Sequence, residues 1–163
     1  MQQVPHDIRS FRRSLRALER QVELSLASQT ECCGVTPAQC HVLLEVSEAG
    51  SPSVSELALA LELDASTLSR AVDGLVKAGF VLREEDPLNR RRYLVSLSPA
   101  GRKKVSEIDR VCDRYYEGML ASLPADDRGL VVEVLPRFTE ALKSWRSSCC
   151  GSGCRAPRKE AKA

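Results

Sequence analysis

The chain has 163 residues and a formal net charge of +2. Its length fits one domain with a real core, and its charge alone is too weak to argue for a nucleic-acid partner. Hydrophobic residues make up 43% of the chain and aromatic residues only 4%, which favours a helical core of Leu, Val and Ala. No apolar run approaches the roughly 18 residues of a membrane span, and no apolar signal region precedes the first helix, so we expect a cytoplasmic protein with no membrane partner.

The first expected helix covers residues 7–28. Its apolar positions recur at three- and four-residue spacing and form a narrow seam of the kind that packs against another helix: Ile8, Phe11, Leu15, Leu18, Val22 and Leu26. Residues 31–34, Glu-Cys-Cys-Gly, break this pattern. A second helix begins in residues 36–39, which supply a cap, a first-turn proline and a capping-box glutamine, and it runs to Gly50.

The two helices of a helix-turn-helix follow. Ser53 and Glu56 form a capping box for a short apolar helix through Leu61. Asp64 can accept the free amides of the next helix, and Gly79 supplies the backbone freedom to end it. One face of that helix is a buried stripe: Leu68, Val72, Leu75 and Val76. The other face offers short hydroxyls and one long cation: Ser66, Thr67, Ser69 and Arg70.

An arginine-rich hairpin is expected next. Two short strand-like runs, residues 80–83 and 93–97, are joined by residues 84–92, which read EEDPLNRRR. This connection places three arginines at the tip of the hairpin: Arg90, Arg91 and Arg92. A helix-turn-helix followed by such a hairpin is a winged helix, expected here over residues 36–104.

Two long helices should follow the wing. Ser98-Pro99 caps the first, and Pro124 opens the second, which Pro136 should kink or locally break. The apolar faces of these helices and of the N-terminal helix have no partner in a winged-helix core of this size. We therefore expect them to be buried against a second subunit.

The expected fold class is mainly α with a small β-hairpin wing, arranged as one domain over residues 1–163. Its dimerisation region comprises residues 1–35 and 105–148. Residues 149–163 form a cysteine-rich tail that ends in a small, polar, disordered segment.

The distribution of charge singles out the winged helix as the part that meets DNA. Residues 66–104 hold nine Lys and Arg against four Asp and Glu, a balance of +5, so the remainder of the chain carries 2 − 5 = −3. Arg70 can pair with guanine O6 and N7, and hydroxyls on the same face can reach bases or phosphates. Arginines at a hairpin tip suit a narrow minor groove, where negative potential is concentrated.

The spacing of these elements and the Asp-Pro-x-Asn-Arg-Arg segment resemble the MarR family of bacterial transcriptional regulators over roughly residues 7–145. The resemblance implies that the helix after Asp64 enters the major groove. It also implies that Arg91, with Arg90 second, enters the minor groove, and that the N-terminal and last two helices form a homodimer. The family's usual Asp is replaced by Asn89, which weakens any ion pair that orients the arginine. A phenolic ligand between the subunits is a further option within the family.

The chain has seven cysteines, a high and odd number. A secreted disulfide framework is disfavoured without a signal region, and clustered cytosolic cysteines more often bind metal or react with oxidants. Cys40 and Cys112 fall within helices and fit the core, with a ligand role one turn below Cys33 as the alternative for Cys40. Cys154 is a candidate third ligand in the tail. Two vicinal pairs lie beside glycines that can turn both sulfurs toward one ion: Cys32 with Cys33, and Cys149 with Cys150.

Soft thiolates select soft ions, and vicinal pairs do not resemble the Cys-x2-Cys knuckles of structural zinc. They suit arsenite, which takes up to three thiolates. The sequence therefore predicts a non-enzymatic, homodimeric repressor that requires no cofactor. A thiophilic metal or metalloid, with arsenite first, would release it from its double-stranded DNA operator.

Two other functions compete with this interpretation. In a redox sensor the same cysteines would form disulfides on oxidation. A thiol enzyme or metal carrier would need a nucleophile beside a base, or Cys-x-x-Cys in a βαβ context, and the sequence offers neither.

Overall fold

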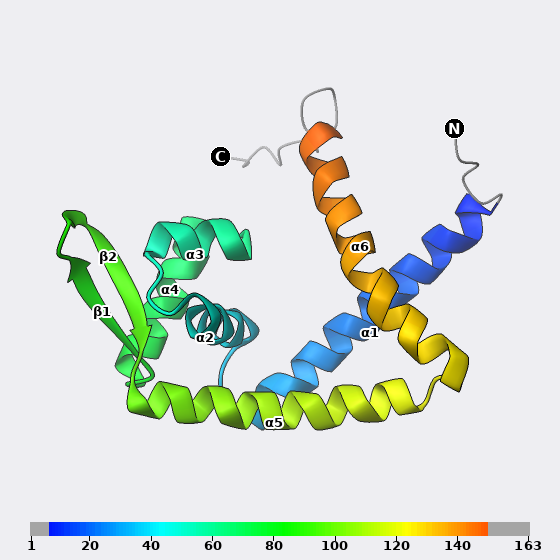
Figure 1. The fold of residues 1–163 in the computed structure, drawn as a ribbon, viewed down its shortest axis with the longest axis horizontal. Coiled ribbons are helices and arrows are strands. Elements are labelled where there is room, and N and C mark those ends of the chain that lie inside the picture. The colour runs from blue at the N-terminus through cyan, green and yellow to red at the C-terminus, as the bar shows by residue number, and fades with distance from the viewer. Residues whose placement is uncertain (1–6, 150–163) are drawn as a thin grey trace, which may run out of the picture. The chain divides into compact units, whose positions relative to one another are not determined.

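The computed structural model describes residues 7–149, of which residues 26–33, Arg91 and Cys149 are described by their backbone alone. The elements follow in the expected order, and the fold is mainly α with a β-hairpin wing, which confirms the predicted fold class (Figure 1). They are α1 (Ile8–Cys33), α2 (Pro37–Ala49), α3 (Val54–Leu61), α4 (Ala65–Lys77), β1 (Val81–Asp86), β2 (Asn89–Leu97), α5 (Pro99–Ala121) and α6 (Ala125–Cys149).

The contacts within the chain define two compact units, divided within α5. One unit extends to Cys112 and contains α1, the helix-turn-helix, the hairpin and the first part of α5. The other begins at Asp113 and contains the end of α5 and all of α6.

Side chains at the starts of α2 and α3 form the capping boxes that the sequence predicts. At α2, the amide of Gln39 donates to Thr36 Oγ1 over 3.3 Å and the amide of Thr36 donates to Gln39 Oε1 over 2.9 Å. At α3, Ser53 and Glu56 exchange the same two hydrogen bonds, of 3.3 and 2.7 Å. Each box satisfies two amides that a helix start would otherwise leave unpaired.

The core of the first unit is built where α2, α3, α4, the hairpin and α5 converge. Its buried apolar residues are Val35, Val42, Leu43, Val46, Leu57, Leu68, Ala71, Val72, Leu75, Val81, Val95, Val105 and Ile108. The stripe predicted on α4 is right except at one position, because Val76 is 40% exposed and Ala71 is buried in its place. This core holds α4 by one face and leaves its polar face in solvent.

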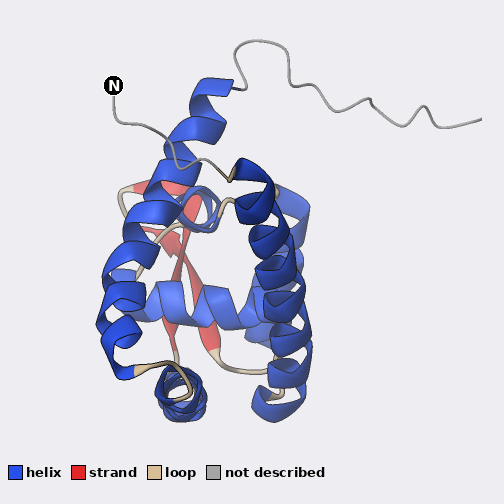
Figure 2. Ribbon diagram, turned by 90° about the vertical axis from the view of Figure 1, so that its right-hand side faces the viewer, coloured by secondary structure: helices blue, strands red, loops and turns tan. Residues whose placement is uncertain are grey.

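The hairpin is longer than the sequence suggested. Strand β1 pairs antiparallel with β2, and the two are drawn in red in Figure 2. Asp86 Oδ1 accepts the amide of Leu88 over 2.9 Å, and this local turn lets Asn89 pair directly with Asp86. Because the turn closes so tightly, pairing continues into the segment expected to be a loop. Arg90, Arg91 and Arg92 were predicted to lie in the connection between the strands, and that placement was wrong: they lie in β2, with Arg90 close to the turn.

The expected break at residues 31–34 was also placed too early. Helix α1 continues through Cys32 and Cys33, and the chain leaves the helix at Gly34, which has φ +65°. Residues 29–33, Gln-Thr-Glu-Cys-Cys, contain no helix breaker, whereas Gly34 is the first residue that adopts a positive φ without strain. The cysteine pair is thus the end of a helix.

Helix α6 continues through Pro136 as one element. Its ribbon changes direction partway along, in the yellow-to-orange stretch of Figure 1, which fits the kink expected of an internal proline. No helix in residues 7–149 is long and apolar enough to cross a membrane.

Candidate DNA interface

The start of α4 is organised by Asp64. Its carboxylate accepts the amides of Ser66 and Thr67 over 3.0 and 2.9 Å, and it also accepts both hydroxyls. The hydrogen bonds from the Ser66 and Thr67 side chains are the largest of the causes that hold the pKa of Asp64 far below its usual range. Because both hydroxyls donate their hydrogen to Asp64, their oxygens can act only as hydrogen-bond acceptors toward another partner.

Further along α4, Ser69 and Arg70 are exposed on the same face. Arg70 Nε donates to the carbonyl of Ser66 over 3.1 Å, a hydrogen bond that does not use the two terminal nitrogens of this exposed side chain. Ser69 Oγ lies 3.4 Å from Asp73 Oδ2. The four residues predicted as major-groove contacts therefore share one stretch of α4, in which Ser66, Ser69 and Arg70 are exposed and Thr67 is half-buried.

Asp73 connects α4 to the hairpin. Its Oδ1 lies 3.4 Å from Arg83 Nη1 on β1, and the Arg83 guanidinium stacks 4.5 Å from the ring centre of Tyr93 on β2. The ion pair is surface-exposed, so it contributes little to stability. It links strand β1 to the polar face of α4.

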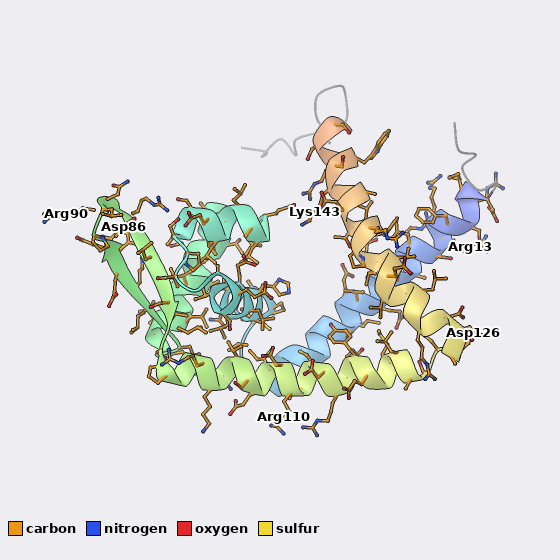
Figure 3. The ribbon with its side chains drawn as sticks, in the orientation of Figure 1. Arg13, Asp86, Arg90, Arg110, Asp126 and Lys143 are labelled. Atoms are coloured by element: carbon orange, nitrogen blue, oxygen red, sulfur yellow. The ribbon has the colours of Figure 1, made fainter. Side chains whose placement is uncertain are left out.

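The three consecutive arginines of β2 differ in their surroundings. Arg92 Nη2 lies 3.2 Å from Glu56 Oε1 on α3, and Arg92 Nε lies 3.8 Å from Asp86 Oδ2. Arg90 is exposed, makes no ion pair among the described residues, and projects outward beside Asp86 at the end of the hairpin (Figure 3). Arg91 is a member of β2 whose side chain is not described. Arg92 thus links the hairpin to α3, whereas Arg90 is exposed and available to meet a phosphate.

Strand β2 is also attached to the segment that precedes α3. The amide of Val95 donates to the carbonyl of Pro52 over 2.9 Å, and Ser53 forms an isolated antiparallel bridge with Leu94. Both bonds fix the base of the hairpin against the helix-turn-helix.

The structure leaves the predicted inducer site untested. Cys32 and Cys33 are the last two residues of α1 and Cys149 is the last of α6, but their side chains are not described, and Cys150 and Cys154 lie outside the described residues. Where side chains are described, no group of three or more His, Cys, Asp or Glu could hold a metal ion. Cys40 and Cys112 pack against the core as partly buried residues, as the sequence predicts.

Large apolar side chains remain exposed along three helices. On α1 they are Ile8, Phe11, Leu18, Val22 and Leu24; on α5, Tyr115, Tyr116 and Met119; on α6, Leu130, Val131, Val132, Val134, Leu135, Leu142 and Trp145. A monomer in water seldom exposes so many on consecutive turns. These helices correspond to the predicted dimerisation region.

The core, the helix-turn-helix and the hairpin define a winged helix-turn-helix protein. The sequence model of the MarR family matches residues 35–93. The Bacillus subtilis transcriptional repressor MdtR is 33% identical over 95 residues, which are 58% of this chain and 61% of that protein. YcgE of Bacillus subtilis, an uncharacterised transcriptional regulator, is 30% identical over 121 residues, which are 69% of this chain and 78% of that protein.

A crystal structure of MarR has the same fold, with a TM-score of 0.72 at 25% identity, covering 90% of this chain and 99% of that one. In three curated relatives the match spans 61% to 69% of their length. The chain belongs to the MarR family. These relatives are transcriptional regulators and not enzymes, in agreement with the interpretation of the sequence.

Proposed function

We propose that this protein is a homodimeric, DNA-binding transcriptional repressor that a thiophilic metal or metalloid releases from its operator. The observation that carries the DNA-binding part is the exposed face of α4. It combines Arg70 with three hydroxyls, beside a hairpin whose Arg90 is exposed. Such a face can read base edges in the major groove while the hairpin reaches the backbone or the minor groove.

The homodimer is supported by the apolar side chains exposed along α1, the end of α5 and α6. A second subunit of the same chain is the simplest partner that would bury these side chains, since symmetric dimers are the commonest soluble oligomers. Repression is the direction that the name of the relative MdtR suggests.

The inducer part rests on the placement of the cysteine pairs. Cys32 and Cys33 end α1 and Cys149 ends α6, so the thiolates belong to the helices proposed to dimerise and not to the helix proposed to read DNA. An ion that favours a different arrangement of the two subunits would change the separation of their two α4 helices, and half-sites on DNA tolerate little change. Arsenite is the first candidate because three thiolates satisfy it.

Selection of duplexes from a random-sequence DNA pool tests the DNA-binding and dimer parts together. The proposal predicts an enriched sequence with two half-sites related by a two-fold axis and centred about 34 Å apart. Enrichment of a single unpaired site would contradict the dimer, and no enrichment at all would contradict DNA recognition.

A further inference from the structure

The carboxylate of Glu56 serves two elements at once. Its Oε2 accepts the amide of Ser53 over 2.7 Å and so caps α3, while its Oε1 lies 3.2 Å from Arg92 Nη2 on β2. The two residues that meet in this ion pair are 36 positions apart in the sequence. Glu56 therefore joins the first helix of the helix-turn-helix to the hairpin.

Other contacts make this junction well defined. Ser53 is almost fully buried and bridges to Leu94, two residues after Arg92 on the same strand. On its other side Arg92 faces Asp86, which shapes the turn at the end of the hairpin. The Arg92 guanidinium thus lies between a carboxylate at the start of α3 and a carboxylate at the turn of the hairpin.

We infer that Glu56 is a positioning residue for DNA binding: through Arg92 it holds the hairpin at the angle that brings Arg90 to the DNA backbone. The inference rests on the proposed function and adds to it, since neither Glu56 nor Arg92 need touch DNA. It gives two of the three arginines different tasks: Arg92 positions the hairpin and Arg90 contacts the DNA backbone.

A positioning role for Glu56 and a purely electrostatic role predict opposite effects of its neutralisation on DNA affinity. Glu56 is a negative charge in a region proposed to meet a polyanion, so its neutralisation should strengthen DNA binding if charge alone matters. If Glu56 positions the hairpin, its neutralisation should weaken binding.

The substitution Glu56→Gln separates these effects from folding. Glutamine can replace glutamate in a capping box, so α3 keeps its cap while the ion pair with Arg92 loses its charge. The matched control is Glu48→Gln on α2. It changes the net charge by the same amount, and Glu48 is exposed and makes no ion pair in the described part of the chain.

The probe is a duplex selected on the wild-type protein from a random-sequence pool. For Glu56→Gln we expect affinity to fall about two- to fivefold, the range open to one exposed ion pair, with an unchanged melting temperature. Glu48→Gln should bind as the wild type does or slightly better. In an Arg90→Ala background Glu56→Gln should cause no further loss, because the contact that it positions is already absent.

Unchanged or tighter DNA binding by Glu56→Gln would contradict the positioning role of Glu56. So would a loss of affinity in the Arg90→Ala background as large as the loss in the wild-type background. If the wild type selects no duplex at all, it is the proposed function that fails.

Discussion

Gly101, in the first turn of α5, packs directly against the backbone of Phe80. A Cβ added at Gly101 would lie 1.9 Å from the carbonyl oxygen of Phe80. Ser98 tightens the same junction, since its Oγ donates to the carbonyl of Gly79 over 2.6 Å and accepts the amide of Gly101 over 2.9 Å. The end of α4, the start of β1 and the start of α5 are thus held at a distance that only glycine permits.

Gly101→Ala should therefore destabilise the protein by about 1–3 kcal/mol or more, because the neighbouring atom is backbone and cannot turn aside. Gly118→Ala is the matched control in the same helix, where an added Cβ meets nothing within 4 Å. It should raise stability by about 0.5–1 kcal/mol through helix propensity. Denaturant unfolding measures both, and equal effects of the two substitutions would contradict the packing described.

The cap of α4 should make stability depend on pH. Hydrogen bonds, first from the Ser66 and Thr67 side chains, lower the pKa of Asp64 in the folded state. The contribution of Asp64 to the free energy of unfolding is therefore complete above its unfolded-state pKa of about 3.9. It is lost as pH falls through the lower pKa of the folded state. Asp64→Asn keeps a cap that does not titrate.

Denaturant midpoints at neutral pH and at successively lower pH test this point. Below about pH 4 the wild type should lose more stability than Asp64→Asn, because only the wild type must protonate its cap. Parallel losses in the two proteins would show that Asp64 does not carry the effect.

The proposed dimer should be sensitive to charge on α6. Leu135 is about half exposed, and Leu135→Glu would place a carboxylate among apolar side chains if a second subunit covers them. We expect the dimer dissociation constant to rise about tenfold or more, measured by sedimentation. Leu59→Glu on α3 is the control, since Leu59 is also exposed and lies outside the proposed interface. A wild-type protein that stays monomeric at micromolar concentration would contradict the dimer.

The cysteine pairs should matter for release and not for binding. Variants with Cys32 and Cys33 changed to serine, or Cys149 and Cys150 changed to serine, should bind DNA as the wild type does but resist release by arsenite. Cys112→Ser, at a partly buried residue packed on the core, is the control and should respond normally. Full release of both double variants by arsenite would exclude these ligands, and release of the wild type by peroxide alone would favour redox sensing.

The helices, their caps and the order of elements could be predicted because their determinants are local. The capping boxes at Thr36 and Ser53, and the cap at Asp64, each depend on residues two or three positions apart. The extent of the hairpin could not be predicted, since it depends on how tightly Asp86 closes the turn. The Glu56–Arg92 and Asp73–Arg83 pairs were missed because residues distant in the sequence meet only in the folded chain.

The DNA interface could be predicted only in part, because some of its features depend on local sequence and others on contacts between distant residues. The amphipathic pattern of α4 identified its exposed face, and composition identified the arginines of the wing. Neither pattern could show that Arg92 is engaged by two carboxylates while Arg90 is exposed, because the partners of Arg92 come from α3 and from the turn.

The most direct test of DNA binding by the winged helix compares duplex binding by Arg70→Ala and Arg90→Ala over a series of salt concentrations. Arg70→Ala should lose about 1–3 kcal/mol on the selected duplex and little on random duplex, so that base preference relaxes. Arg90→Ala, and likewise Arg91→Ala, should weaken binding to both duplexes. Each should also reduce the slope of the logarithm of the binding constant against the logarithm of salt concentration by about 1. If these variants bind both duplexes as tightly as the wild type does, the winged helix is not the DNA-binding surface of this protein.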